Sequence, residues 1–288
     1  MSPPDSKASL AALGLKASLA ALGLKASPAA LGSKASLAAL GLNAALRSAL
    51  AARGFNLLLP LSEAAFDGAC APVAPALRLR ALLGEAAPPA GEAASAIIVG
   101  SGGRAMFEQF RAAPEAADGA RNPLDRFTRA AVGAAAGETL GAAGIAHRIY
   151  FPFTDSVPAL PFQRLGRAAG IGPPGPLGLQ IHPELGPWWA YRALIALAGD
   201  WSDVVPATPL GDACAGCPAP CVAACPAGAV RLTGFSVPDC HARRRTAPAC
   251  HLSCDARIAC VRGPEHRYRD VELAFHMRAS MPRRSSTP

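Results

Sequence analysis

Short apolar runs separated by amphipathic stretches mark the chain between residues 43 and 205. The segment NAALRSALAARGFNLLLPLS predicts a helix, a stop at Gly54 and a short apolar strand. Ala96–Gly100 predicts a second strand, which is buried and ends in a glycine turn, and Ala146–Phe153 predicts a third. Strands and helices in alternation predict an α/β (α+β) sandwich domain over residues 43–205.

Two further helices are predicted in the same region. Leu124–Leu140 is predicted to form one, with Asn122 at its start. The aromatic residues Trp188, Trp189 and Tyr191 are predicted to begin the other and to pack the α/β domain against the part of the chain that follows.

A nine-residue unit of the form KASLAALGL repeats through residues 7–42. Alanine and leucine favour helix, whereas the glycine in every unit and Pro28 oppose a continuous one. Residues 1–42 are therefore predicted to be a low-complexity, disordered extension. The repeats at residues 7–42 are rich in serine, alanine, lysine and leucine and contain no acidic residue, so they also resemble an organelle-targeting peptide.

The expected compartment follows from what the sequence lacks. No run of about 18 or more apolar residues is free of charged or turn residues, so neither a transmembrane helix nor a membrane partner is predicted. Lys16, Lys25 and Lys34 interrupt any apolar core of a secretory signal. We expect a cytoplasmic, reducing location, where clustered cysteines bind metal or catalyse more often than they form disulfides.

The composition changes at Pro206, after which cysteine, proline and glycine dominate. Residues 206–270 are predicted to form a small ferredoxin-like domain organised by metal rather than by an apolar core. Residues 271–288 are predicted to be a basic tail. The net charge is +8, and the arginines beside the cysteines either balance anionic clusters or form a docking face for an acidic electron donor or for nucleic acid.

The cysteines begin with the run DACAGCPAPCVAACPAGAV, which has the spacing C-x2-C-x3-C-x3-C and Pro226 after the last. Bacterial ferredoxins have C-x2-C-x2-C-x3-C-P, whose fourth cysteine ligates the other cluster. Short loops let three sulfurs surround one iron–sulfur cube closely, and the proline then turns the chain away. The run and the looser segment after it supply eight candidate metal ligands, namely Cys214, Cys217, Cys221, Cys225, Cys240, Cys250, Cys254 and Cys260.

Eight cysteines suit two 4Fe–4S clusters of four ligands each. In the two-cube pattern the last cysteine returns to the first cube, so the first predicted set is Cys214, Cys217, Cys221 and Cys260. The second predicted set is Cys225, Cys240, Cys250 and Cys254. A zinc site, disulfides, and a single cube on the first run stay open as alternatives. Cys70 stands alone and is predicted to be a buried apolar residue.

The segment AAGIGPPGPLGLQIHPELGPWWAYRALI, followed by the cysteine run, resembles the epoxyqueuosine reductase family. That family has an A-G-(hydrophobic)-G stretch, an Asn/His-Pro-Glu-like segment, a Gly-aromatic-aromatic segment, the cluster motif and then an isolated cysteine, which Cys240 matches. FTDSVPALPFQRLGRAAGIG is similar to its D-S-x-P segment, so the resemblance covers roughly residues 120–262.

The resemblance implies an α/β domain that binds cobalamin beside two 4Fe–4S clusters, with electrons passing from cube to cube and then to cobalt. The residue that matches the family's proton donor is Asp155, for which a turn or helix-cap role is the alternative. His182 and Glu184 are candidate ligand contacts, or they build a turn around Pro183. Residues 170–176 lack the tryptophan and lysine of the family, so we expect a substrate other than epoxyqueuosine on tRNA.

The sequence therefore predicts an iron–sulfur oxidoreductase that passes single electrons to a ligand at the domain interface. Its expected partner is an electron donor such as a flavodoxin or a ferredoxin reductase system. Two other classes stay open. One is a non-enzymatic ferredoxin-like electron carrier, and the other is a metal protein that binds nucleic acid through its basic ends.

Overall fold

The computed structural model describes residues 34–153, 159–201 and 210–281. In chain order its elements are α2 (Lys34–Ala51), β1 (Leu57–Ser62), α3 (Glu63–Cys70), α4 (Leu79–Leu83), η2 (Gly84–Ala86), β2 (Ala94–Gly102), α5 (Ala105–Ala112), η3 (Pro114–Ala116), α6 (Pro123–Ala136), η4 (Gly137–Gly141), β3 (His147–Tyr150), α7 (Phe162–Ala168), β4 (Trp189–Ala198), α8 (Pro220–Ala223), β5 (Val230–Arg231), β6 (Gly234–Phe235), α9 (Val237–Thr246), η5 (Pro248–His251), α10 (Asp255–Ile258), η6 (Pro264–His266) and α11 (Asp270–Ala279). None of the helices in these ranges combines the length and the apolar character that crossing a membrane requires.

A four-stranded antiparallel sheet forms the centre of the larger part, in the order β1-β2-β4-β3. Every residue of β2 is buried. The reason is that β1 and β4 pair with its two edges while helices cover both of its faces. Ile97 of β2 lies opposite Ile195 of β4 at the middle of the sheet. Branched side chains of this kind pack well on a pleated surface that is covered on both sides.

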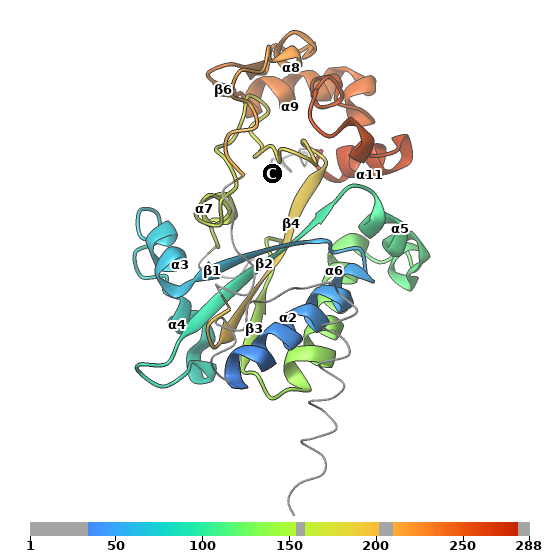
Figure 1. The fold of residues 1–288 in the computed structure, drawn as a ribbon. Coiled ribbons are helices and arrows are strands. Elements are labelled where there is room, and N and C mark those ends of the chain that lie inside the picture. The colour runs from blue at the N-terminus through green and yellow to red at the C-terminus, as the bar shows by residue number, and fades with distance from the viewer. Residues whose placement is uncertain (1–33, 154–158, 202–209, 282–288) are drawn as a thin grey trace, which may run out of the picture.

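The helices form two layers, one on each face of the sheet (Figure 1). On one face α2, α5 and α6 pack against Ile97, Val99 and Ile195. On the other face α3, α4 and α7 pack against Ile98 and Leu194. Successive residues of β2 and β4 thus point into opposite layers, as strand geometry requires. The prediction of a mixed α/β architecture is confirmed.

The predicted strands and two of the predicted helices are present, and the helix predicted before Gly54 is the C-terminal part of α2. The three predicted strands correspond to β1, β2 and β3, and the helix predicted at Leu124–Leu140 is α6 with the π-helical turn η4 after it. The predicted stop at Gly54 is a left-handed glycine, with φ 85°, between α2 and β1. A Cβ there would also collide with the backbone of Met106. Both the positive φ and the lack of space therefore require glycine at this turn.

The prediction of a helix at Trp188, Trp189 and Tyr191 is wrong, because this segment opens the strand β4. The run WAYRALIALA is apolar throughout, and such a run suits a buried helix and a fully covered strand equally well. The segment forms a strand because it pairs with β2 on one side and with β3 on the other. Trp188 does pack against the cysteine-rich part, with its ring centroid 5.4 Å from that of Tyr268.

Both ends of the described chain differ from the predicted boundaries. α2 begins at Lys34, inside the segment predicted to be a disordered extension. The first half of the basic tail predicted at residues 271–288 belongs to the helix α11. The ring of Phe275 in α11 lies 5.4 Å from the rings of both Phe107 and Phe110, centroid to centroid. These aromatic contacts hold the helix against the larger part, which the basic composition did not indicate.

The cysteine-rich part stacks on the end of the sheet where β4 begins (Figure 1). It has a small apolar core of its own, formed by Leu177, Ile181, Val230 and Ala256 together with several of the cysteines. Leu177 and Ile181 come from the loop between α7 and β4, so the larger part contributes to this second core. The two-stranded hairpin β5-β6 follows α8.

Candidate metal centre

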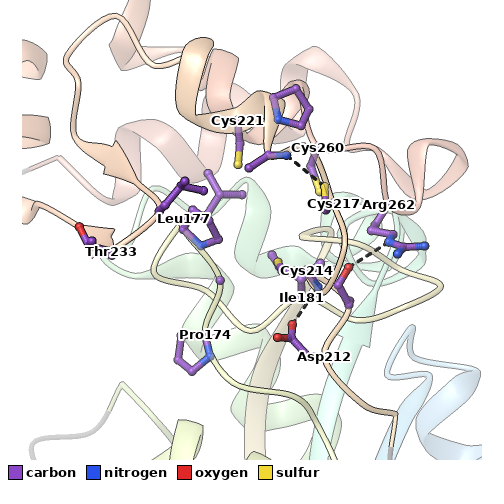
Figure 2. A pocket seen from close by; sticks show the side chains of 17 residues that line it. Pro174, Leu177, Ile181, Asp212, Cys214, Cys217, Cys221, Thr233, Cys260 and Arg262 are labelled. Carbon is purple, nitrogen blue, oxygen red and sulfur yellow. Dashed lines mark hydrogen bonds between the residues drawn. The ribbon is translucent and has the colours of Figure 1, made fainter.

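Four cysteines from two distant stretches of the chain line one cavity of about 310 Å³ (Figure 2). Cys214 and Cys217 lie in the loop before α8, Cys221 lies in α8, and Cys260 follows α10. Their sulfur atoms face the same space, which Leu177 closes from the other side. The structure thus brings together the four cysteines of the first predicted set.

The cysteines of the second predicted set also lie near one another. Cys225 follows α8, Cys240 lies in α9, Cys250 lies in η5, and Cys254 immediately precedes α10. Burial raises the pKa of the Cys240 thiol, Arg244 opposes the shift, and the Cys254, Cys225 and Cys250 thiols add to it. Mutual electrostatic effects of this kind require short distances, so these four side chains are gathered as well.

The protonation of these thiols depends on what lies beside them. Burial raises the pKa of the Cys214 thiol to about 11, and Asp212 and the three other cysteines of its set add to the shift. Burial also raises the pKa of Cys221 and of Cys260. Such thiols are protonated at neutral pH when no cation is near, whereas a coordinated metal removes the proton. The donor set therefore fits a cationic group held by thiolates.

Local contacts shape the loop that bears the first three cysteines. The Cys214 N–H donates to the carboxylate of Asp212 at 2.8 Å, and the Ala219 N–H donates to Sγ of Cys217 at 3.4 Å. Ala219 is the middle residue of the lengthened gap before Cys221, and its φ of 51° is left-handed. A residue with a Cβ adopts this conformation at a cost. This conformation directs the N–H of Ala219 toward Sγ of Cys217.

The loop between α7 and β4 forms a wall of the same cavity. A Cβ on Gly175 would lie 2.6 Å from Sγ of Cys214, so a larger residue at this point would require the sulfur to move. Further along the loop, a Cβ on Gly186 would lie 2.0 Å from the carbonyl oxygen of Arg262. Arg262 Nε in turn donates to the carbonyl of Ala213 at 3.1 Å. The loop and the cysteine-rich part are thus in close contact at Gly175 and at Gly186, on either side of the loop residues that line the cavity.

Neither cysteine set is arranged as a site for a single metal ion. Across residues 34–153, 159–201 and 210–281, no three or more His, Cys, Asp or Glu side chains are grouped so that they could hold one ion. The nine cysteines are free thiols. The members of the first set therefore surround a cavity rather than converge on one point.

The remaining predicted site residues lie outside this cavity or outside the described chain. Asp155 falls in a segment that the structure does not describe. His182 is buried, its Nδ1 accepts hydrogen bonds from the N–H groups of Glu184 and Leu185, both at 3.2 Å, and burial lowers its pKa. These contacts form the turn around Pro183 that the sequence offered as an alternative. A ligand contact by His182 or Glu184 stays a prediction.

Cys70 is the ninth cysteine and lies in neither set. It ends α3 and is fully buried against the sheet, in the layer that also contains Phe66 and Leu79. Burial raises the pKa of its thiol to about 11. The prediction of a buried apolar cysteine is confirmed.

The sequence did not reveal two charged side chains where the cysteine-rich part meets β4, the half-buried Arg257 and the buried Glu272. The guanidinium of Arg257 lies 4.9 Å from the ring centroid of Trp188 and 4.8 Å from that of Tyr268, and it donates to the carbonyl of Pro187 at 2.6 Å. Glu272 of α11 is only 2% exposed, and burial raises its pKa to about 8. The paired tryptophans indicated a contact here. The sequence around Arg257 and Glu272, however, gives no indication that these charged side chains are removed from solvent.

No protein-family model matches the chain, and no curated protein matches it.

Proposed function

We propose that the protein is an iron–sulfur redox protein whose C-terminal part, a ferredoxin-like domain, holds two 4Fe–4S clusters. The first set (Cys214, Cys217, Cys221 and Cys260) and the second set (Cys225, Cys240, Cys250 and Cys254) each supply four ligands. One observation supports the proposal above all others. Cys260 lines the same cavity as Cys214, although the whole second set lies between them in the chain.

The space between the thiols suits a polynuclear group. A tetrahedral zinc ion, with Zn–S bonds of about 2.3 Å, requires its four sulfurs to lie within about 4 Å of one another. An iron–sulfur cube requires a wider arrangement, because iron and sulfide atoms stand between the cysteine sulfurs. Four thiols around a cavity of about 310 Å³ leave room for the wider arrangement.

Positive charge and N–H groups accompany both sets. Arg262 lies near Cys260, while Arg244 lies near Cys240 and lowers the pKa of that thiol against the effect of burial. The backbone N–H of Arg257 and its charge act in the same direction on Cys254. Such neighbours stabilise thiolates and the negative charge of a cluster bound by them. They favour the charge-balancing role of the arginines over a docking face.

When bound, clusters of this kind accept and release single electrons. We propose an oxidoreductase related to epoxyqueuosine reductase, in which the electrons reach a ligand at the interface between the two parts. Cobalamin is the candidate that the resemblance implies. The chain's own contribution to this interface is the stack of Trp188, Arg257 and Tyr268, which lies directly beside the ligand residue Cys254.

Metal and sulfide analysis of anoxically purified protein tests the proposal. We expect brown protein with about eight iron atoms and about eight acid-labile sulfides per chain. Colourless protein with stoichiometric zinc would contradict the iron–sulfur assignment. About four iron atoms would contradict the second cluster alone. Titration with cobalamin, followed by the visible spectrum, then separates a reductase, for which the spectrum shifts, from an electron carrier, for which it does not.

A further inference from the structure

Exposed apolar side chains gather around the hairpin β5-β6 of the cysteine-rich part. Leu232 in the hairpin turn is 76% exposed, and Phe235 and Val237 after it are also exposed. Leu179, from the loop between α7 and β4, is exposed as well. A Cβ on the neighbouring Gly178 would lie 3.0 Å from Cβ of Phe235, so this loop and the hairpin are in contact. We call these four apolar side chains, Leu179, Leu232, Phe235 and Val237, the hairpin patch.

The hairpin patch lies at the opening of the cavity that the first cysteine set surrounds. Leu232, Thr233 and Gly234 of the hairpin turn line this cavity together with the cysteines. Because Leu232 both lines the cavity and is largely exposed, the cavity reaches the molecular surface at the hairpin turn. A protein bound on the hairpin patch would therefore lie beside a cluster held by the first set. Electrons pass between proteins only over short distances, so this position suits an exchange of electrons.

Positive charge borders the patch on the side of α7. The side-chain amide of Gln163 donates to the carbonyl of Gly178 at 3.2 Å, which places this face of α7 next to the loop that carries Leu179. Arg167 lies on the same face, four residues after Gln163. It is exposed and forms no ion pair with any residue of the described ranges. Its guanidinium is thus available to an acidic partner.

Positive charge also borders the patch on the side of α9, which begins at Val237. Arg243 and Arg245 of this helix are exposed. The acidic residue of the same helix, Asp239, is already paired with Arg231 at 2.5 Å. An apolar centre bordered by positive charge is complementary to a partner with an acidic surface.

We propose that the hairpin patch is the docking surface for an acidic electron-transfer protein. The inference rests on the proposed function, since it requires a cluster in the first set. The apolar side chains form the centre of the contact, and the arginines of α7 and α9 steer the partner toward it. In each encounter one electron leaves the reduced partner, which is oxidised, and is accepted by the cluster. Four apolar side chains suit the small contact areas of transient redox encounters.

Stopped-flow reduction of the anoxically purified full chain by a flavodoxin hydroquinone tests the surface, because flavodoxin is an acidic one-electron donor. Leu232→Ser should lower the second-order rate constant about fivefold at low and at high salt, since it removes apolar contact and no charge. Arg167→Glu should lower it about fivefold at low salt only. At about 1 M salt, where charges are screened beyond about 3 Å, its rate should equal that of the parent.

Val271→Ser is the matched control. Val271 is an exposed apolar residue of α11, which lies across the cysteine-rich part from the hairpin (Figure 1). Its variant should be reduced as fast as the parent. Dithionite, a small reductant that needs no docking surface, should reduce all four proteins at equal rates. Leu232 and Arg167 are exposed, so their variants are expected to fold and to keep their iron, which iron analysis checks.

The outcomes separate the docking surface from the clusters. Protein without iron would overturn both proposals. Iron-loaded protein that flavodoxin reduces equally fast with and without Leu232→Ser would overturn the docking surface alone, and so would parent protein that dithionite reduces and flavodoxin does not. A dimer of the parent that Leu232→Ser dissociates would assign the patch to a second copy of the chain and overturn the proposal as well.

Discussion

Gly175 lies against the sulfur of Cys214, so closely that a Cβ on the glycine would stand 2.6 Å from Sγ. Gly175 belongs to the loop between α7 and β4, whereas Cys214 opens the cysteine run. The cavity of the first cysteine set is thus completed by backbone from the larger part of the molecule. The cysteine-rich part is therefore not an independent module attached to a scaffold, because one of its two proposed cluster sites depends on the loop before β4.

Gly175→Ala should halve the iron content of anoxically purified protein. The added methyl group would displace Cys214 and remove one ligand of the first set, so about four of about eight iron atoms should be lost. Iron determined per chain measures the effect. Gly68→Ala is the control, since Gly68 is an exposed glycine of α3 with open space around it, and its variant should keep all its iron. Full iron in Gly175→Ala would refute the structural role of this contact.

Substitution of Ala219 should stabilise the protein when the new residue is glycine and destabilise it when the new side chain is larger. Its φ of 51° is left-handed, which costs a residue with a Cβ about 1–2 kcal/mol. Ala219→Gly removes that cost at some loss of chain entropy, so we expect a gain of up to about 1 kcal/mol with the N–H to Cys217 retained. Ala219→Val should destabilise by more than that. Thermal midpoints of the anoxic proteins decide, and a lower midpoint for Ala219→Gly would be incompatible with a strained alanine.

Glu272 should make stability depend on pH. Burial raises its pKa from 4.5 to about 8, with Arg192 and Arg257 opposing the shift and Glu108 adding to it. Between these values the folded protein holds a proton that the unfolded chain has released, so the free energy of unfolding falls as pH rises. The contribution of the neutral carboxyl is complete below about pH 4.5 and is lost as the pH passes about 8.

Glu272→Gln removes this titration while keeping a neutral side chain of the same shape. Between pH 6.5 and 8.5 the parent should lose about 2 kcal/mol of stability that the variant keeps. This range avoids His276, whose pKa burial lowers to about 3, because that contribution to stability is lost only as pH falls. Thermal unfolding of both proteins at the two pH values measures the difference. Parallel curves would mean that Glu272 is ionised in the folded protein.

Some elements of the larger part were predictable from local patterns, whereas α3, α4, α5, α7 and β4 were not. β1 and β2 were predictable because each is a short apolar run bounded by turn residues. β4 was not, because an apolar run such as Trp189–Ala198 has no distinguishing period and becomes a strand only through its two partners in the sheet. α11 was not predicted, because the net positive charge of residues 271–288 favoured a tail, although Phe275 supplies the apolar anchor that a helix needs.

The cysteine sets show the same division between local and distant information. The grouping of Cys260 with Cys214 was predictable, because the two-cube pattern assigns the last cysteine to the first cube. The wall formed by Gly175 was not, since a glycine in a Gly/Pro-rich stretch predicts a turn and says nothing about a contact across the molecule. The burial of Glu272 likewise depends on neighbours that come from β4 and α10, which no local pattern reveals.

Iron analysis of two cysteine variants tests the central claim most directly. Cys260→Ser removes the proposed fourth ligand of the first set, and Cys70→Ser changes the one cysteine that belongs to neither set. Two interleaved clusters predict that anoxically purified Cys260→Ser retains about four iron atoms per chain while Cys70→Ser retains about eight. Equal iron contents in the two variants would contradict the claim that Cys260 and Cys214 share a cluster.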